Sequence, residues 1–369
     1  MKILHTSDWH LGISVHGFSM LEEQKHFKDE LISIIRTVNA DAVLVSGDVF
    51  DSSVATGEAI GLYNDIATEI CLKLGVPLIV TAGNHDGAAR LSSMHELLKK
   101  SGLYVIGRLT RNTEPVIIGN AAIYPLPHFN TDEVRALYPD EKIKTYESAV
   151  NTVCSKLRSG LDKSRFNIIM AHVFASGAAL SDSDRSAVIG TASMVSHEVF
   201  KGFDYAALGH LHKPQKICEH VYYSGSPVKY SFSEAKTDKS VNLIDTDTGE
   251  VTQLPLQPIH DMRIIKGTLE EILSESCNDY VKAEITDGYA GLEALEALSA
   301  GFPHLLAVTG KAAAESDAVS VDVNDMEKLS PSEMLDSFFN DNYGETADND
   351  FKELFAQALS DAENGGELQ

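Results

Sequence analysis

Short apolar runs alternate with segments of helical periodicity through roughly the first 260 residues. Apolar residues recur three and four positions apart from Phe27 to Val38 and from Ala59 to Ile70, which predicts two amphipathic helices. Five apolar runs are candidate buried strands: Lys2–Thr6, Ala42–Ser46, Pro77–Ala82, Phe166–Ala171 and Asp204–Leu208. Such alternation of strand and helix is typical of an α/β domain.

A second, smaller α/β unit follows a break in this pattern. Tyr222–Ser226 and Val241–Asp245 are predicted to be strands, and the pattern then stops at the two prolines of Pro255–His260. Beyond the break we expect three strands and two helices, which are, in chain order, Met262–Lys266, Leu269–Glu275, Tyr280–Thr286, Leu292–Ser299 and Leu305–Thr309.

Two amphipathic helical patterns, Pro331–Asn342 and Asn349–Ala362, lie near the C-terminus. Their apolar faces pack either on the chain's own domains or on a partner. The partner interpretation is favoured because two such helices form a poor core by themselves. We therefore predict a main domain over 1–257, a smaller domain over 258–315, and a C-terminal helical region over 316–369.

The net charge of −24 is unevenly distributed along the 369 residues. From Glu315 to Gln369 there are fifteen acidic and two basic residues, so −13 of the total lies there and −11 in the preceding 314 residues. The acidity of the main part is mild. It weakens the hypothesis of a nucleic-acid partner, whose phosphates Lys and Arg would bind, without excluding it.

The sequence predicts neither export nor membrane insertion. The opening MKILHTSDWH turns polar too early for a signal peptide, and no apolar run approaches the roughly 20 residues that cross a bilayer. The four cysteines are scattered without a CxxC pair, as expected for thiols in a reducing compartment. We expect a cytoplasmic protein without a membrane partner.

Each of the five candidate strands is followed directly by a potential metal ligand. In open α/β sheets the site lies beyond the carboxyl ends of the strands, so these side chains should meet at one edge. The predicted ligands are Asp8, His10, Asp48, Asn84, His172, His210 and His212. Each motif alone is ordinary turn or core chemistry. Five of them, each at a strand end, are unlikely to coincide, and together they predict a metal centre.

The residue types suit two divalent cations. A carboxylate such as Asp48 has two oxygens and can bridge ions about 3.5–4 Å apart. Asp, Asn and His without Cys favour manganese, iron or zinc over calcium or magnesium. The remaining histidines are interpreted as ordinary structural residues, namely His5, His16, His26, His95, His128, His197, His220, His260 and His304.

These motifs resemble the five motifs of the calcineurin-like metallophosphoesterases. The resemblance implies a four-layer α/β/β/α sandwich and a two-metal phosphoesterase. It assigns one ion to Asp8, His10, Asp48 and His212. It assigns the other ion to Asp48, Asn84, His172 and His210. Mn²⁺ is the expected metal.

Three segments narrow the resemblance to the SbcD family, the nuclease subunits of bacterial SbcCD complexes. They are the opening His5–Gly12, the stretch Ser181–Arg185 and the stretch Gly225–Ala235. The family implies a double-strand exonuclease and a hairpin or single-strand endonuclease in DNA repair and recombination. It also implies a DNA-binding capping domain, a homodimer within a heterotetramer, and an SbcC-type coiled-coil ATPase bound by the C-terminal helices.

His85 and Asp51 are the predicted catalytic pair. By the resemblance His85, which follows Asn84, protonates the leaving 3′-oxygen, a role suited to imidazole. The alternative is a structural histidine beside the metals. Asp51 stands where archaeal relatives carry a second catalytic histidine, and we predict that it orients His85 and raises its pKa. Equally, Asp51 fits the N-cap of the following helix.

Two other functions fit the metal motifs. One is a phosphodiesterase or phosphatase of the same superfamily that acts on small nucleotides or phosphoproteins. The other is a non-catalytic DNA-end tether, which the intact ligand set and His85 disfavour. Four basic residues near the motifs are either phosphate contacts or ordinary surface charges, namely Arg90, Arg185, Lys213 and Lys229.

Overall fold

The computed structural model describes residues 1–179, 194–288 and 292–310, together with Lys352. The chain divides into two units, Met1–Lys311 and Ala312–Gln369. The second unit lies almost wholly outside the described residues, as do the predicted C-terminal helices and Arg185.

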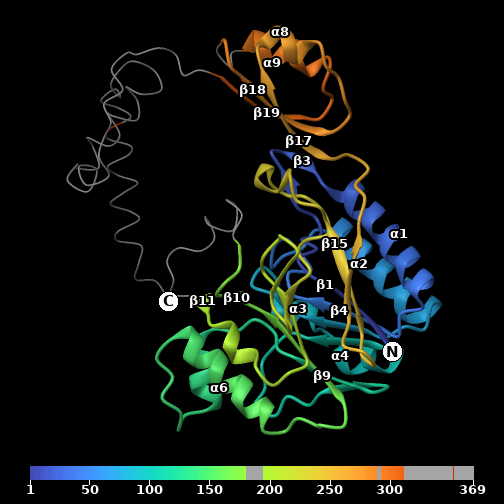
Figure 1. Cartoon of the computed structure of the whole chain (residues 1–369), viewed down its shortest axis with the longest axis vertical. Coiled ribbons are helices and arrows are strands. Elements are labelled where there is room, and N and C mark those ends of the chain that lie inside the picture. Colours follow the sequence, from blue (N-terminus) through green and yellow to red (C-terminus); the bar gives the residue numbers. More distant parts are fainter. Residues whose placement is uncertain (180–193, 289–291, 311–351, 353–369) are drawn as a thin grey trace. The chain divides into compact units, whose positions relative to one another are not determined.

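Two six-stranded sheets form the main domain (Figure 1). The first has the order β16-β15-β1-β4-β5-β6 and the second the order β13-β14-β12-β9-β8-β7. The strands of the first are β1 (Lys2–Thr6), β4 (Ala42–Ser46), β5 (Leu78–Thr81), β6 (Leu103–Ile106), β15 (Ser240–Asp245) and β16 (Val251–Pro255). Those of the second are β7 (Val116–Ile118), β8 (Ala121–Pro125), β9 (Phe166–His172), β12 (Tyr205–Gly209), β13 (Gln215–Cys218) and β14 (Val221–Tyr223).

The central strands of both sheets run parallel. In the first sheet these are β1, β4, β5 and β6, and in the second they are β8, β9, β12 and β14. Parallel pairing requires crossover connections, which the intervening helices supply. It also aligns the carboxyl ends of the strands at one edge, which is the edge where the predicted ligands begin.

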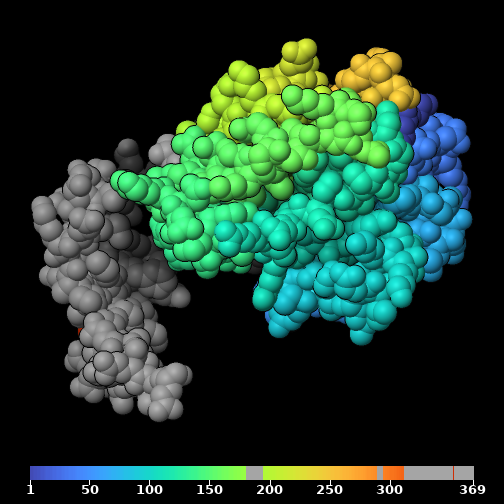
Figure 2. Space-filling model, turned by 90° about the horizontal axis from the view of Figure 1, so that it is seen from below, coloured from blue at the N-terminus to red at the C-terminus, as the bar shows by residue number. Residues whose placement is uncertain are grey.

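Helices cover the outer faces of the two sheets. α1 (Leu21–Val38) and α2 (Gly57–Ala67), which continues as a π-helical turn (η1, Thr68–Lys73), pack on the first sheet. α5 (Thr131–Leu137) and α6 (Tyr146–Arg158) pack on the second, and this green region forms part of the surface seen in Figure 2. A third apolar cluster lies between the sheets. The predicted four-layer α/β/β/α sandwich is confirmed.

The smaller α/β segment has a three-stranded parallel sheet of β17 (Met262–Gly267), β18 (Tyr280–Ile285) and β19 (Leu305–Thr309). Its helices are α8 (Leu269–Leu273) and α9 (Leu292–Ser299). Thr268 begins α8 with a capping box: its hydroxyl accepts from Glu271 N, and its own N–H donates to the Glu271 carboxylate. The predicted strand–helix order of this segment is confirmed.

Several short elements complete the described chain. Two small strand pairs are β2 (Ser14–Val15) with β3 (Phe18–Ser19), and β10 (Phe174–Ala175) with β11 (Met194–Val195). The short helices are α3 (Ala88–Leu91), α4 (His95–Leu98), η2 (Lys99–Ser101), η4 (His197–Phe200) and η5 (Phe232–Glu234). No described helix combines the length and apolar character that a membrane crossing requires.

Candidate metal centre

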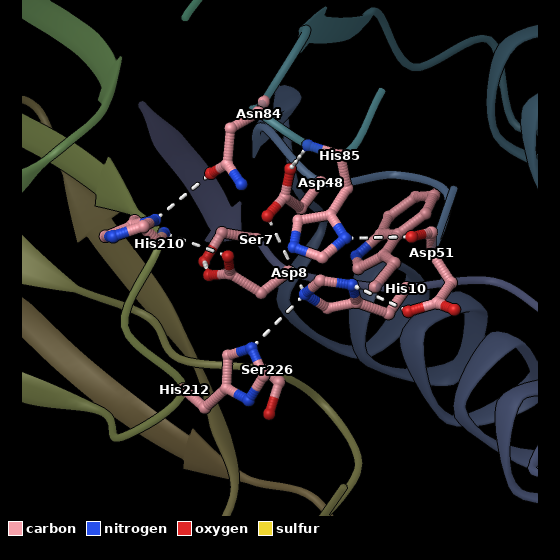
Figure 3. A network of polar contacts seen from close by, with 12 residues as sticks. Ser7, Asp8, His10, Asp48, Asp51, Asn84, His85, His210, His212 and Ser226 are labelled. Carbon is pink, nitrogen blue, oxygen red and sulfur yellow. Dashed lines mark hydrogen bonds and ion pairs between the residues drawn. The ribbon is translucent and has the colours of Figure 1, made fainter. Parts of the chain in front are cut away.

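The seven predicted ligands lie together at or just beyond the carboxyl ends of β1, β4, β5, β9 and β12. Figure 3 labels six of them, Asp8, His10, Asp48, Asn84, His210 and His212. Three of these strands belong to the first sheet and two to the second, so the site joins the sheets at one edge. The side chains converge although the positions span more than two hundred residues of sequence, as the strand-end argument predicted.

Asp8, His10 and His212 form one group. Their donor atoms all lie within 4.8 Å of one another. The two Nε2 atoms of His10 and His212 face each other at 3.2 Å, and Asp48 Oδ2 is 3.7 Å from His10 Nε2. Two imidazole nitrogens turned toward one point beside carboxylates are the arrangement expected of ligands to one cation.

Asp48, Asn84, His172 and His210 form the second group. Asp48 Oδ2 lies 3.1 Å from His172 Nε2. Asn84 Oδ1 lies 3.0 Å from His172 Nε2 and 3.1 Å from His210 Nδ1. The same Asp48 oxygen therefore faces both groups, which is the position that a bridging carboxylate requires.

The backbone is strained at four of these seven positions. Asp8 (φ 53°), His10 (φ 43°), Asp48 (φ 49°) and His210 (φ 101°) all have positive φ. They are four of the seven non-glycine residues with positive φ among those described. Such conformations persist only where the surroundings enforce them, and they cluster at functional sites.

Glycines allow the two sheets to approach at this edge. A Cβ on Gly47 would lie 2.2 Å from His172 Nδ1, and one on Gly209 would lie 1.9 Å from the Ser46 carbonyl oxygen. The same Ser46 oxygen accepts from His172 Nδ1 at 2.9 Å. That bond leaves His172 Nε2 directed into the cluster.

Asp86 ties two of the ligand loops together. Its buried carboxylate accepts hydrogen bonds from Val49 N at 3.1 Å, Phe50 N at 2.9 Å and Gly83 N at 2.8 Å. Asp48 and Asn84 lie on the two loops that it joins. Asp86 was not among the predicted site residues, although it lies two positions after the predicted ligand Asn84.

Burial and charge act against each other at the two buried acids. Burial raises the pKa of Asp8. Burial would also raise the pKa of Asp48, but the imidazoles of His172, His10 and His85 together hold that pKa well below its usual range. Burial would lower the pKa of His172, yet Asp48 and then Asp8 raise it to about 9. Strong mutual perturbation among adjacent titratable groups is typical of functional sites.

His85 and Asp51 do contact each other, but not through the Asp51 side chain. His85 Nδ1 bonds to the backbone carbonyl oxygen of Asp51 at 2.8 Å, and His85 N donates to Asp48 Oδ1 at 2.9 Å. The Asp51 carboxylate instead lies 3.5 Å from His10 Nδ1. The helix-cap alternative for Asp51 is wrong, because the N-cap of α2 is Thr56, whose side chain accepts from Ala59 N.

The described basic residues near the site differ in their freedom to reach a phosphate. Lys229 Nζ is bonded to Asp261 Oδ1 at 2.7 Å and to the Ala235 oxygen at 2.9 Å. Arg90 is exposed but donates to Ser53 O at 2.7 Å, and Lys213 is exposed. Arg90 and Lys213 are therefore accessible to a phosphate, whereas Lys229 is committed to the protein.

The donor set fits a pair of divalent cations. Carboxylate, amide and imidazole groups converge without a thiolate, a combination that suits first-row metals. The positive φ angles and the glycines without room for a Cβ show that the fold holds these donors close together.

Comparison with known families and proteins agrees with this geometry. The calcineurin-like phosphoesterase family matches residues 1–214, more than half of the chain. The chain therefore belongs to the calcineurin-like phosphoesterases. A second family, described as the type 5 capsule protein repressor C-terminal domain, matches residues 258–343.

Two curated relatives narrow this further, and both are named as the SbcD subunit of the nuclease SbcCD. The protein from Staphylococcus saprophyticus is 30% identical over 353 residues, which cover 94% of each chain. The protein from Staphylococcus epidermidis is 32% identical over 318 residues, which cover 84% of this chain and 85% of the relative. Within the phosphoesterases, the chain thus groups with the SbcD proteins.

Among solved structures, the crystal structure of TT1561 from Thermus thermophilus is 13% identical. The match covers 69% of this chain and 99% of that one, with a TM-score of 0.41. At that score the likeness adds nothing to the family assignment.

Proposed function

We propose that this protein is a two-metal phosphodiesterase that cleaves DNA, with an SbcC-type ATPase as its partner. The observation that carries the proposal is the convergence of seven donor side chains from five strand ends in a chain that belongs to the phosphoesterases. The names of the two staphylococcal relatives support a nuclease over a small-molecule phosphatase.

In this proposal Asp8, His10 and His212 would hold one ion and Asn84, His172 and His210 the other, with Asp48 contributing to both. Mn²⁺ is the metal we expect, because the donors are oxygen and imidazole nitrogen. When bound, such a pair binds the phosphate, lowers the pKa of a water and offsets charge that develops at phosphorus.

His85 is proposed to donate a proton to the leaving 3′-oxygen. Its side chain is exposed toward the site, and its Nδ1 is fixed by the Asp51 backbone oxygen. This bond leaves Nε2 as the nitrogen available to a substrate. Asp51 then acts on His85 through its backbone, while its carboxylate lies 3.5 Å from His10 Nδ1.

The domain organisation is proposed to be a nuclease domain over 1–257, a capping domain over 258–315 that contacts DNA, and a partner-binding region over 316–369. The family match that begins at residue 258 supports the first boundary. Both duplex ends and hairpins are proposed substrates. The acidic C-terminal region is proposed to bind the coiled-coil ATPase.

A homodimer within a heterotetramer is also proposed. Met94 is 74% exposed and Leu97 is 64% exposed, both in or beside α4. Exposed large apolar side chains that lie close together mark association surfaces. A cytoplasmic location is supported by the four cysteines, all of which are free thiols.

The decisive experiment compares two substrates. The purified chain with Mn²⁺ is assayed on a hairpin-ended DNA duplex and on a generic phosphodiester dye, with and without the ATPase partner. We expect both substrates to be cut. The nuclease proposal fails if only the dye is cleaved even when the ATPase is present.

A truncation tests the partner region. Removal of residues 330–369 should abolish binding to the ATPase, measured by co-sedimentation, while metal-dependent cleavage of short substrates is retained. Partner binding by the truncated chain would contradict the docking proposal.

A further inference from the structure

A buried ion pair lies directly behind His212. Glu234 ends the short helix η5, and Lys239 immediately precedes β15. The Glu234 side chain is fully buried, and the Lys239 side chain is 4% exposed. Glu234 belongs to the Gly225–Ala235 segment, and so does Ser226, which also contacts Lys239. The metal motifs assign no role to this segment.

The contacts of the pair are complete. Glu234 Oε2 accepts from Lys239 Nζ at 2.5 Å, and Glu234 Oε1 lies 3.3 Å from His212 Nδ1. Lys239 Nζ also donates to Ser226 Oγ at 2.7 Å and to the His212 carbonyl oxygen at 2.8 Å. All three ammonium hydrogens therefore have acceptors, and one of them fixes the backbone of His212 itself.

A buried ion pair is an expensive way to stabilise a fold, because desolvation of both charges offsets their attraction. Apolar residues of similar volume serve stability equally well or better. The location of this pair, with one oxygen on a histidine of the metal centre, points to a different purpose.

The hydrogen bond to Glu234 determines which His212 nitrogen is free. With Nδ1–H donating to the carboxylate, the lone pair of Nε2 is directed toward Asp8 and His10, the other members of its group. The histidines of the second group are supported differently. His172 Nδ1 donates to the Ser46 backbone oxygen, with the Asp8 carboxylate 3.9 Å away, and His210 Nδ1 faces Asn84 Oδ1 at 3.1 Å.

We propose that Glu234, held by Lys239, is a positioning residue that fixes His212 as an Nε2 donor to one metal ion. This inference rests on the proposed metal centre. Glu234 supplies the carboxylate behind the histidine, Lys239 holds that carboxylate in place, and the nitrogen on the opposite side of the ring is left free for an ion.

The test measures Mn²⁺ binding to the whole chain, both by calorimetry and by the electron paramagnetic resonance signal of free Mn²⁺. The wild type should bind two ions. Glu234→Gln should bind one ion with unchanged affinity and the other about 10–100-fold more weakly, the usual loss when an outer-shell partner is removed.

Glu23→Gln is a matched control. Glu23 is also a buried carboxylate that accepts from a histidine, at 2.8 Å from His260 Nδ1, and its other hydrogen bonds go to the backbone of Ile259 and His260, not to any of the seven ligands. This variant should keep both Mn²⁺ affinities. A second test variant, Glu234→Leu with Lys239→Met, replaces both charges with apolar side chains that the fold tolerates, and should show the same weakened ion.

A spectroscopic readout separates orientation from general damage. In the metal-free wild type, ¹⁵N chemical shifts of the His212 ring should report protonation at Nδ1, whereas the double variant should show a mixture of tautomers. If Glu234→Gln and the double variant both fold and keep the wild-type Mn²⁺ affinities, the inference about Glu234 is wrong while the proposed metal centre stands. A wild type that binds no Mn²⁺ would overturn the proposed metal centre itself.

Discussion

Histidines are buried both between the two sheets and at the edge where their strands end, but the pKa values shift in opposite directions in the two places. His5 lies on β1 between the sheets, where its Nδ1 meets the Tyr205 hydroxyl at 3.0 Å, and burial lowers its pKa to about 3. His172, equally buried at the edge, has a pKa raised to about 9 by Asp48 and Asp8 against the effect of burial. Because both histidines are fully buried, the neighbouring carboxylates of His172 account for the difference between the two pKa values.

The same strand serves both regions. β1 places His5 in the interior, and the residues just after its end bring Asp8 to the edge. The interior is an apolar cluster with the polar contacts of His5, Tyr205 and Asn242 beside it, whereas the edge combines charge, positive φ and partial exposure. The first arrangement belongs to the fold, and the second gathers the proposed metal ligands.

The largest expected effect is at the edge. Asp48→Ala removes the carboxylate that faces both groups, so Mn²⁺ binding should fall to one weak site or none and DNA cleavage should fall on the order of 10⁴-fold, as for loss of a central catalytic group. DNA cleavage is measured on a hairpin substrate, and Mn²⁺ binding is measured by calorimetry. Asp132→Ala, at an exposed carboxylate on α5, is the control and should change neither.

His85→Ala should separate proton transfer from metal binding. Both Mn²⁺ ions should still bind, while cleavage falls about 10²–10⁴-fold, the range for loss of a general acid. A phosphodiester with a good leaving group, which needs no protonation, should be cut with a smaller loss. If metal is lost together with activity, the role proposed for His85 is wrong.

Between the two sheets, we expect an effect of His5 on the pH dependence of stability and none on catalysis. Because the pKa of His5 is about 3 in the fold and about 6.5 when unfolded, the unfolded chain alone takes up this proton as the pH falls below 6.5. His5 should therefore reduce stability by about 2 kcal/mol between pH 7.5 and pH 5.0.

Urea unfolding of the metal-free protein at the two pH values measures this loss. His5→Gln has no ionisable group, so its stability should fall by about 2 kcal/mol less than that of the wild type over the same range. Equal pH dependence of the two proteins would show that His5 is accessible to protons in the folded state.

The smallest effect should come from Asp51→Asn. The acceptor of His85 is the Asp51 backbone oxygen, which the substitution retains, and asparagine still offers His10 Nδ1 an oxygen. Cleavage should change by less than about 10-fold. A loss as large as that of His85→Ala would restore a direct role for the carboxylate in proton transfer.

The sequence predicted the ligand-bearing strands closely because they are buried apolar runs that end in polar turns. β1 and β4 have the predicted bounds, and α9 and β19 in the smaller segment do as well. β8 was missed, since its sequence AAIYP combines residues of low strand propensity with a proline. β16 was missed because it alternates weakly and ends at Pro255.

Within the site, residue types and strand ends predicted which side chains meet, but not the groups behind them. The contact between His85 and Asp51 was expected through a side chain and is made by the backbone, which no residue type encodes. The carboxylate of Glu234 reaches His212 across 22 residues, from a helix of three residues without any periodic signal.

The three hydrogen bonds of Asp86 have a thermodynamic consequence for metal exchange. They hold the Asp48 and Asn84 loops together by backbone contacts that involve no ion. The conformational entropy of these loops is therefore lost when the chain folds and not when an ion arrives. Ion binding at this edge should accordingly show little of the heat-capacity change that accompanies coupled folding, and the apoprotein should reload without refolding.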